Sequence, residues 1–119
     1  MSTNATSGYV VTYNGATLTS GANTIPVATI TGDSDGAPGT SQFALCGKAT
    51  TGTPTVTAGY VCSTSSDYNF VASTTTTLVT KASPVSGDVV SVAYLADISG
   101  GQASGSYSTQ VRYVDTATF

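Results

Sequence analysis

The side chains that carry most enzyme chemistry are scarce in this sequence. Its 119 residues include no histidine, all six acidic residues are aspartate, and the three basic residues are Lys48, Lys81 and Arg112. A serine nucleophile needs a general base beside it. The Ser-x-x-Lys spacing that would supply one does not occur, since Leu45 and Leu78 stand three residues before the two lysines. No spacing indicates the paired carboxylates of a glycosidase either. We therefore expect no enzymatic activity and no cofactor.

The two cysteines, Cys46 and Cys62, are the clearest chemical signal. An even number of cysteines in a chain poor in charge and rich in serine and threonine predicts one disulfide in an oxidising compartment. In the entropic view, closing a loop of about 15 residues stabilises the fold by about 3 kcal/mol. The alternative is two buried free thiols. A tetrahedral metal site is not expected, because two cysteines without histidine supply too few ligands.

Asp33 and Asp35, followed by Gly36, resemble the beginning of a calcium loop. Alternating carboxylates can converge on one ion, and glycine permits the turn. No glutamate completes the set, so further ligands would have to come from Asp88 or Asp97. An ordinary turn in which aspartate side chains bond the backbone explains the same residues. We favour the turn and expect no metal.

The composition predicts a single all-β domain covering residues 1–119. Charged residues make up 8% of the chain, while threonine, valine, serine, tyrosine and glycine dominate, a mixture that suits half-buried strands and tight turns. Short strands separated by glycine and proline predict an antiparallel β-sandwich, of immunoglobulin-like or pilin-like type, with seven or more strands. The scattered basic residues argue against nucleic-acid binding. We also expect no membrane insertion, because no apolar run is long enough to span a bilayer.

Three stretches give the sharpest expectations for individual strands. Residues 105–119 alternate between apolar and polar types without a break, which predicts a long strand with one buried face. Residues 88–96 are almost continuously apolar and are therefore expected near the centre of a sheet. Asn14 and Gly15 lie between two alternating runs and predict a hairpin that pairs residues 8–13 with 16–19. Pro26 predicts an edge strand or a loop lying on the sheet, and residues 31–40 predict a loop.

The low charge also bears on association. A net charge of −3 with so few ionic side chains gives little repulsion between copies of the chain. We expect a subunit whose surface is largely covered by identical neighbours. The alternative is a small soluble domain that tolerates a surface of low charge. The seven tyrosines permit a further reading as a sugar-stacking platform, although tyrosines in strands more often belong to a core.

Several short segments resemble a pattern in secreted surface proteins of uncultivated candidate-phylum bacteria. These segments are residues 2–5, 7–10, 15–21 and 23–25, together with 38–43, where such proteins often have glutamate at the position of Ser41. Residues 105–107 and 111–113 resemble the last strand of those domains and of spore-coat-U-like and pilin-like sandwich proteins. The resemblance implies an exported protein, located outside the cell or on its surface, that usually has more chain before residue 2.

The resemblance leads to a structural function as the main hypothesis. In similar fibre subunits, a groove left by a missing strand is filled by a strand from the next copy, and such head-to-tail contacts build filaments. Residues 1–13 and 111–119 are the two candidate donor segments, and we favour the first. The side chains expected to make the contact are Tyr9, Val10, Val11, Tyr13, Val111, Tyr113 and Phe119. Alternatives are an adhesin or carbohydrate-binding module, and a phage decoration or tail protein.

Overall fold

The computed structural model describes all of residues 1–119 as a β-sandwich without helices. One sheet has the strand order β10-β1-β8-β6 and the other β4-β7-β5-β9, while β2 and β3 form a separate hairpin. All of the ladders within these sheets are antiparallel, as predicted. The strands are β1 (Tyr9–Gly15), β2 (Thr19–Ser20), β3 (Asn23–Thr24), β4 (Thr29–Ile30), β5 (Gln42–Thr51), β6 (Thr55–Val56), β7 (Tyr68–Asn69), β8 (Thr76–Lys81), β9 (Val89–Asp97) and β10 (Val111–Ala117).

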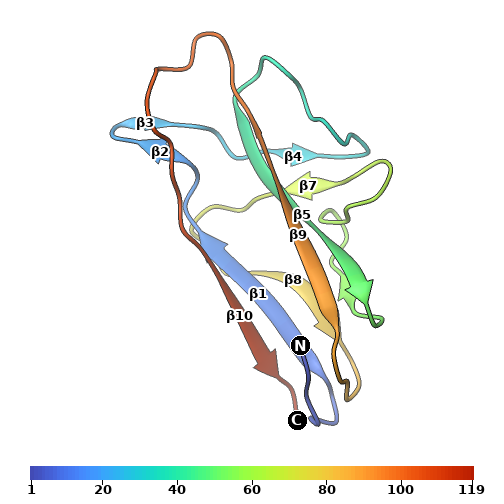
Figure 1. The fold of residues 1–119 in the computed structure, drawn as a ribbon. Helices are drawn as coiled ribbons and strands as arrows, with labels where there is room; N and C mark the ends of the chain where they lie inside the picture. The colour runs from blue at the N-terminus through green and yellow to red at the C-terminus, as the bar shows by residue number, and fades with distance from the viewer.

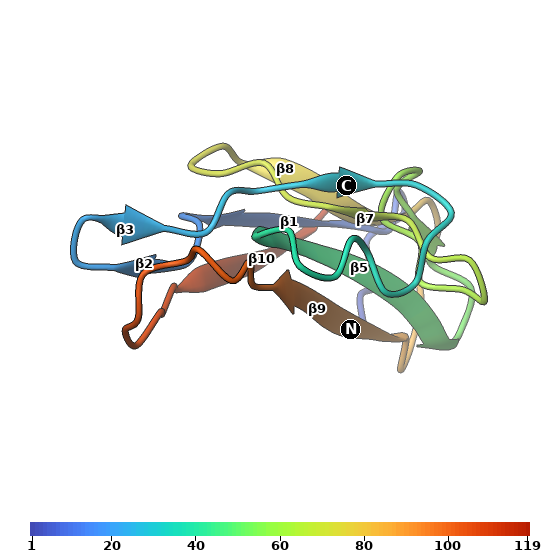
Figure 2. The ribbon, with the colours of Figure 1, turned by 90° about the horizontal axis from the view of Figure 1, so that it is seen from above.

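The molecule is long and thin, with principal extents of 51 × 30 × 18 Å. The long strands β1, β5, β9 and β10 run along its long axis, and both chain ends lie at the same end of the molecule (Figure 1). Seen from above, β9 and β10 occupy one side of the sandwich and β7 and β8 the other (Figure 2). The sandwich therefore has two flanks of different construction.

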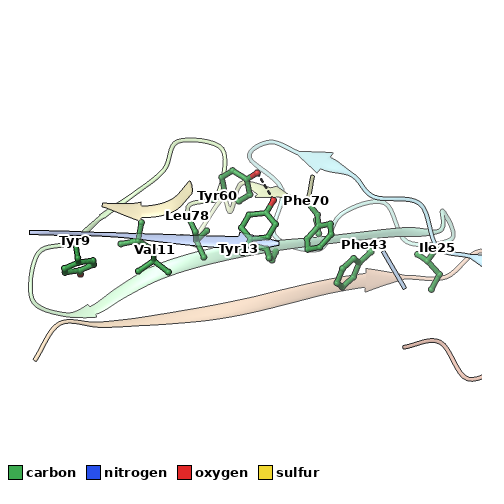
Figure 3. Close-up of a cluster of buried hydrophobic side chains, with 11 residues drawn as sticks. Tyr9, Val11, Tyr13, Ile25, Phe43, Tyr60, Phe70 and Leu78 are labelled. Atoms are coloured by element: carbon green, nitrogen blue, oxygen red, sulfur yellow. Dashed lines mark hydrogen bonds between the residues drawn. The ribbon is translucent and has the colours of Figure 1, made fainter. Parts of the chain in front are cut away.

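The core lies between the sheets and follows β1. The inward side chains of this strand, Tyr9, Val11 and Tyr13, are buried, and their spacing is the period of two that puts alternate residues on one face. They meet Leu78 of β8 and an aromatic group that includes Phe43 of β5 (Figure 3). Tyrosine and phenylalanine bury more apolar area than any aliphatic side chain, which allows a small number of residues to form this core.

The predicted hairpin at Asn14 and Gly15 is wrong. Both residues belong to β1, where they pair with Arg112 and Val111 of β10. Gly15 is required for close approach rather than for a turn, because a Cβ atom there would lie 2.8 Å from the carbonyl oxygen of Gln110. The first hairpin lies later, at the turn between β2 and β3.

The apolar run at residues 88–96 is a strand, as predicted, but its expected place at the centre of a sheet is wrong. It forms β9, which pairs with β5 alone and stands at the edge of its sheet. Its apolar residues are mostly half-buried or exposed. The same pairing extends β5 to Thr51, which lies opposite Val89.

The long terminal strand is shorter than predicted and does not bury one face. β10 comprises seven residues, six of them exposed, because it too is an edge strand, paired with β1 alone. The preceding segment leaves the sheet to join the β2–β3 hairpin, where Ser108 exchanges two backbone hydrogen bonds of 3.0 Å with Thr19. Pro26 precedes the edge strand β4, and residues 31–40 form a loop; both predictions are confirmed.

Candidate functional site

One flank of the sandwich is closed by the chain itself. After pairing with β8 as strand β6, the chain crosses to the opposite sheet, where the Gly47 amide of β5 donates to the Tyr60 carbonyl at 2.6 Å. The Cys62 amide then donates to the Gly47 carbonyl at 2.9 Å. Cys46 and Cys62 form a disulfide across this crossing, with their Cα atoms 5.2 Å apart. The predicted disulfide is confirmed, and it joins the crossing segment to β5.

Two buried tyrosines hold this flank to the core. The hydroxyls of Tyr13 and Tyr60 are hydrogen-bonded at 2.9 Å (Figure 3), and the backbone amide of Val71 donates to the Tyr13 oxygen at 2.9 Å. The rings of Tyr13 and Tyr60 meet edge to face with centroids 5.9 Å apart. Burial, and then the hydrogen bond with Tyr13, raise the pKa of Tyr60. These polar groups are satisfied inside the core, as buried hydroxyls must be.

The opposite flank is open. It consists of β9 and β10, the edge strands of the two sheets. Near the middle of the flank the Tyr94 hydroxyl of β9 and the Tyr113 hydroxyl of β10 form a short hydrogen bond of 2.5 Å. Tyr94 also stacks on Phe43, with ring centroids 6.0 Å apart and planes only 6° apart. Desolvation, followed by the hydrogen bond with Tyr94, raises the pKa of Tyr113. This tyrosine pair is the contact that links the two edges.

An apolar groove runs between the two edges on either side of the tyrosine pair. Toward the chain ends lies a depression of about 260 Å³ whose seven lining residues are all hydrophobic. Val90 and Val92 of β9 form one wall, Tyr113 forms part of the other, and Leu78 and Val11 form the floor. A second, more open depression of about 440 Å³ lies beyond the pair, between Tyr94 and Val111. The floor residues Val11 and Leu78 belong to the core and are at most 9% exposed, so the depressions lie directly over the core without opening it.

The open flank also exposes large apolar side chains. Tyr94 is 49% exposed and Val89 47% on β9, while Val114 is 45% exposed on β10. Single exposed apolar residues are ordinary on protein surfaces. Here they lie on two neighbouring strands, each of which has an edge that pairs with no other strand of the chain, and apolar surface on unpaired strand edges is typical of sites that bind another strand.

The N-terminal segment is fixed at the end of the flank where the two chain ends lie. Thr3 and Val85 exchange two backbone hydrogen bonds of 2.9 Å, and the Met1 amino group donates to the Asp88 carbonyl at 2.6 Å. The Asp88 amide in turn donates to the Met1 carbonyl at 3.0 Å. The segment thus forms a short antiparallel ladder with the residues just before β9, and the side chain of Met1 reaches the groove.

A buried carboxylate lies beneath this ladder. Asp88 is 1% exposed, and its Oδ2 accepts a hydrogen bond of 2.9 Å from the Tyr9 hydroxyl, whereas its Oδ1 has no partner. Burial, and then the hydrogen bond to Asp88, raise the pKa of Tyr9. Gly52 adopts a φ of +78° against this carboxylate, where any Cβ atom would collide with Oδ1. The site therefore requires glycine for two separate reasons.

The structure separates the residues expected to make contacts between copies. Tyr9, Val11 and Tyr13 are buried, and β1 is paired on both sides, with β8 and β10; Val10 lies on the outer face of the same strand. Residues 1–13 are therefore held within their own chain. Three other residues of the expected set lie at or beyond the open flank, where Val111 and Tyr113 line the two depressions and Phe119 is 87% exposed.

Sequence reasoning missed the contribution of β9. Val90, Val92 and Tyr94 occupy alternate positions and face the groove. Their period of two is present in the sequence, but it is hidden because Val89, Ala93 and Leu95 fill the positions between them. A continuous apolar run does not distinguish a central strand from an edge strand.

Asp33 and Asp35 lie side by side in the exposed loop before β5. The Asp33 Oδ1 accepts a hydrogen bond of 3.2 Å from the Asp35 amide, which is the aspartate turn that the sequence favours. A hydrogen bond between the two carboxyl groups lowers the pKa of Asp33 and raises that of Asp35, and the negative charge of Asp33, with a smaller contribution from that of Asp97, raises the pKa of Asp35 further. No group of three or more potential metal ligands is present in the chain.

No protein family, curated protein or solved structure matches this chain. None of its segments forms a helix of the length and apolar character needed to cross a membrane. The distinctive feature of the structure is a groove lined by apolar residues between two strand edges, which suits the addition of further strands.

Proposed function

We propose that the protein is a structural subunit of an extracellular bacterial filament or surface layer, and that its copies join by β-strand pairing at the open flank. The observation that carries this proposal is the pair of long edge strands, β9 and β10, each paired on one side only, with an apolar depression between them. Exposed edges of this kind attract further strands, and proteins that remain monomeric usually protect them with charge, proline or covering segments.

Two further observations support this function. The disulfide favours an oxidising compartment outside the cytoplasm. The low charge of the chain gives little electrostatic resistance to close packing of identical copies. Because residues 1–13 and 111–117 are paired within the chain, we assign the contact to the edges of folded strands rather than to a released terminal segment.

Electron microscopy and light scattering of the purified chain over a range of concentrations test this function. We expect fibres or sheets, and a scattering mass that rises with concentration. A particle of one subunit's mass, 11.8 kDa, at every concentration and without ordered assemblies in micrographs would overturn the proposal.

A second candidate function is a binding module, and one observation favours it. The outer face of the β10-β1-β8 sheet has a polar depression of about 300 Å³, lined by Thr12, Asn14, Thr75 and Arg112 among others. Hydroxyl, amide and guanidinium groups at one place suit the hydroxyls or carboxylates of a saccharide. Binding to a glycan array that disappears in Asn14→Ala, from a chain that stays monomeric, would favour this function over the first.

A further inference from the structure

The directions of the two edge strands decide how the open flanks of two copies can meet. β9 begins beside Met1, through the Asp88 hydrogen bonds, and β10 ends beside Ser7, whose amide donates to the Thr118 carbonyl at 3.0 Å. The start of β9 and the end of β10 therefore lie at the same end of the molecule, and the two strands run in opposite directions. A two-fold axis parallel to the strands preserves those directions, so it brings β9 of one copy antiparallel to β10 of the other.

That operation pairs both edges at once. When β9 of the first copy meets β10 of the second, the same rotation brings β10 of the first copy to β9 of the second, as in any isologous contact. Each four-stranded sheet then continues into the other sheet of the second copy. The two grooves face each other across the axis, and neither copy keeps an unpaired long edge.

The unpaired backbone N–H and C=O groups of β9 and β10 lie at matching positions for this pairing. The N–H and C=O of a residue in an antiparallel strand point to the same side and alternate along the strand. Asp88 directs its N–H and C=O away from β5, toward Met1. The alternate residues Val90, Val92, Tyr94 and Ala96 therefore direct theirs to the free edge of β9. Thr118 directs its N–H and C=O toward β1, at Ser7 and Gly8. The alternate residues Val111, Tyr113, Asp115 and Ala117 therefore direct theirs to the free edge of β10. The side chains of both sets of residues lie on the inner faces of their sheets, so this pairing joins the hydrophobic cores of the two copies.

The charges on the outer face fit the same arrangement. Within one chain, Tyr94 and Tyr113 lie at the same height along the strand direction, because their hydroxyls are hydrogen-bonded. A two-fold axis parallel to the strands preserves height, so Tyr94 of one copy lies opposite Tyr113 of the other. Arg112 then lies one diagonal step from Asp97 of the second copy, a separation that long side chains span. Asp97 already raises the pKa of Asp35 through its negative charge, so this end of β9 is acidic and a cation from a second copy is favourable there.

From these features we propose that two copies of this chain pair through their open flanks, with β9 of each joined antiparallel to β10 of the other and with Arg112 meeting Asp97 twice. This pair would be the building block of the assembly described under Proposed function, on which the inference rests; because the pairing uses both open flanks, the assembly grows through contacts between other faces of such pairs. The occupant of the apolar groove is therefore the flank of a second copy.

Exchanging the two charges tests the pairing. Arg112→Asp and Asp97→Lys each turn two attractive contacts of the pair into repulsive ones, and each alone should weaken self-association about tenfold. An equimolar mixture of the two variants restores both contacts and should associate as strongly as the unaltered chain. Lys81→Asp makes the same charge change as Arg112→Asp, but on β8 away from this flank, and should leave association unchanged. Sedimentation measures association, and circular dichroism verifies that each variant is folded.

The outcomes separate this inference from the proposed function. Restored association in the mixture supports the pairing, and a mixture no stronger than its components, from folded variants, overturns it. Pairs that respond to the exchange but never build fibres would support the pairing and overturn the filament function. Fibres that form equally well in both single variants would support the filament function and overturn this pairing.

Discussion

The two flanks of the sandwich differ in the length and the protection of their edge strands. At the closed flank the edge strands β4 and β6 have two residues each, and the chain crosses between the sheets under a disulfide. At the open flank β9 has nine residues and β10 has seven, and a single pair of tyrosine hydroxyls connects them. The closed flank satisfies its hydrogen bonds within the chain, whereas the open flank retains rows of backbone groups free to pair with another molecule.

Under the proposed function, the comparison assigns stability and association to different sides of one small domain. The buried tyrosine network and the covalent link both belong to the closed flank. Changes there should lower the free energy of unfolding without altering how copies meet. Changes at the open flank should alter association and leave the free energy of unfolding nearly unchanged.

Removing the disulfide should have the largest effect. The double substitution Cys46→Ala and Cys62→Ala releases a loop with a sequence separation of 16, and we expect a loss of about 3 kcal/mol in the free energy of unfolding. Urea denaturation measures this loss. A reducing agent should destabilise the unaltered chain to the same extent and have no effect on the double variant. Equal stability of the two chains would contradict the assignment of this flank as the stabilised one.

Removing the Tyr13 hydroxyl should have the next largest effect on the free energy of unfolding, and Tyr94 provides the comparison. Tyr13→Phe leaves the Tyr60 hydroxyl and the Val71 amide without their partner inside the core, and we expect a loss of about 2 kcal/mol. Tyr94→Phe removes a hydroxyl from an exposed site and should cost less than about 0.5 kcal/mol. Thermal unfolding of both variants measures the contrast. Similar losses from the two substitutions would remove the energetic difference between the flanks.

The buried tyrosines also predict a loss of stability in alkali. Tyr9 and Tyr60 have a pKa above the ordinary value of 10.0 in the folded chain, so the folded state keeps its phenolic protons longer than the unfolded state. Their contribution is complete below pH 10 and is lost as the pH rises beyond it, by about 1.4 kcal/mol per pH unit for each linked proton. Denaturation at several pH values measures the slope. Tyr60→Phe should make it shallower, and an unchanged slope would contradict this cause.

A peptide extension should block the open flank selectively. Because Met1 is paired antiparallel to Asp88, residues fused before Met1 are directed along the free edge of β9. Six added residues that alternate valine and threonine should cover that edge and weaken association at least about tenfold, or 1.4 kcal/mol. Light scattering measures the effect. The same six residues fused after Phe119 are the control, and equal inhibition by the two fusions would indicate a nonspecific cause.

Replacing Asp115 should have the smallest effect on association, and it should strengthen association rather than weaken it. Its side chain is on the inner face of β10, where an inward-pointing charge opposes pairing of the edge. Asp115→Asn should therefore strengthen association by a factor of about 2 to 5, because less charge is removed from water. Asp67→Asn, in the loop before β7, makes the same chemical change away from the open flank and should have no such effect. Weaker association of Asp115→Asn would contradict the model of paired edges.

The sequence predicted the parts of the structure that depend on local chemistry. The all-β sandwich follows from threonine, valine and glycine usage, and the disulfide follows from two cysteines in a chain of low charge. The loop at residues 31–40 lies where its glycine, proline and aspartate residues predict. These features are decided by nearby residues, so they can be recognised without knowing the fold.

Features decided by distant partners were not predictable in this way. Gly15 follows asparagine as in a tight turn, yet it is needed because the backbone of Gln110 approaches it. The apolar run of β9 looks like a buried strand because both of its faces are apolar, but which edge stays unpaired depends on strand order. The candidate site was therefore found at its β10 side, through Val111 and Tyr113, and missed at its β9 side.

The position of the chain ends has a mechanical consequence. Both ends lie at the same end of the molecule (Figure 1), and β1 and β10, the first and last strands, are antiparallel neighbours. Tension applied between the two ends would load the hydrogen bonds of this ladder one after another, beginning at the chain ends, rather than all together. Each bond contributes only about 1 kcal/mol, so the ladder would open at low force. A load-bearing fibre of these subunits must therefore transmit tension through the faces where copies touch.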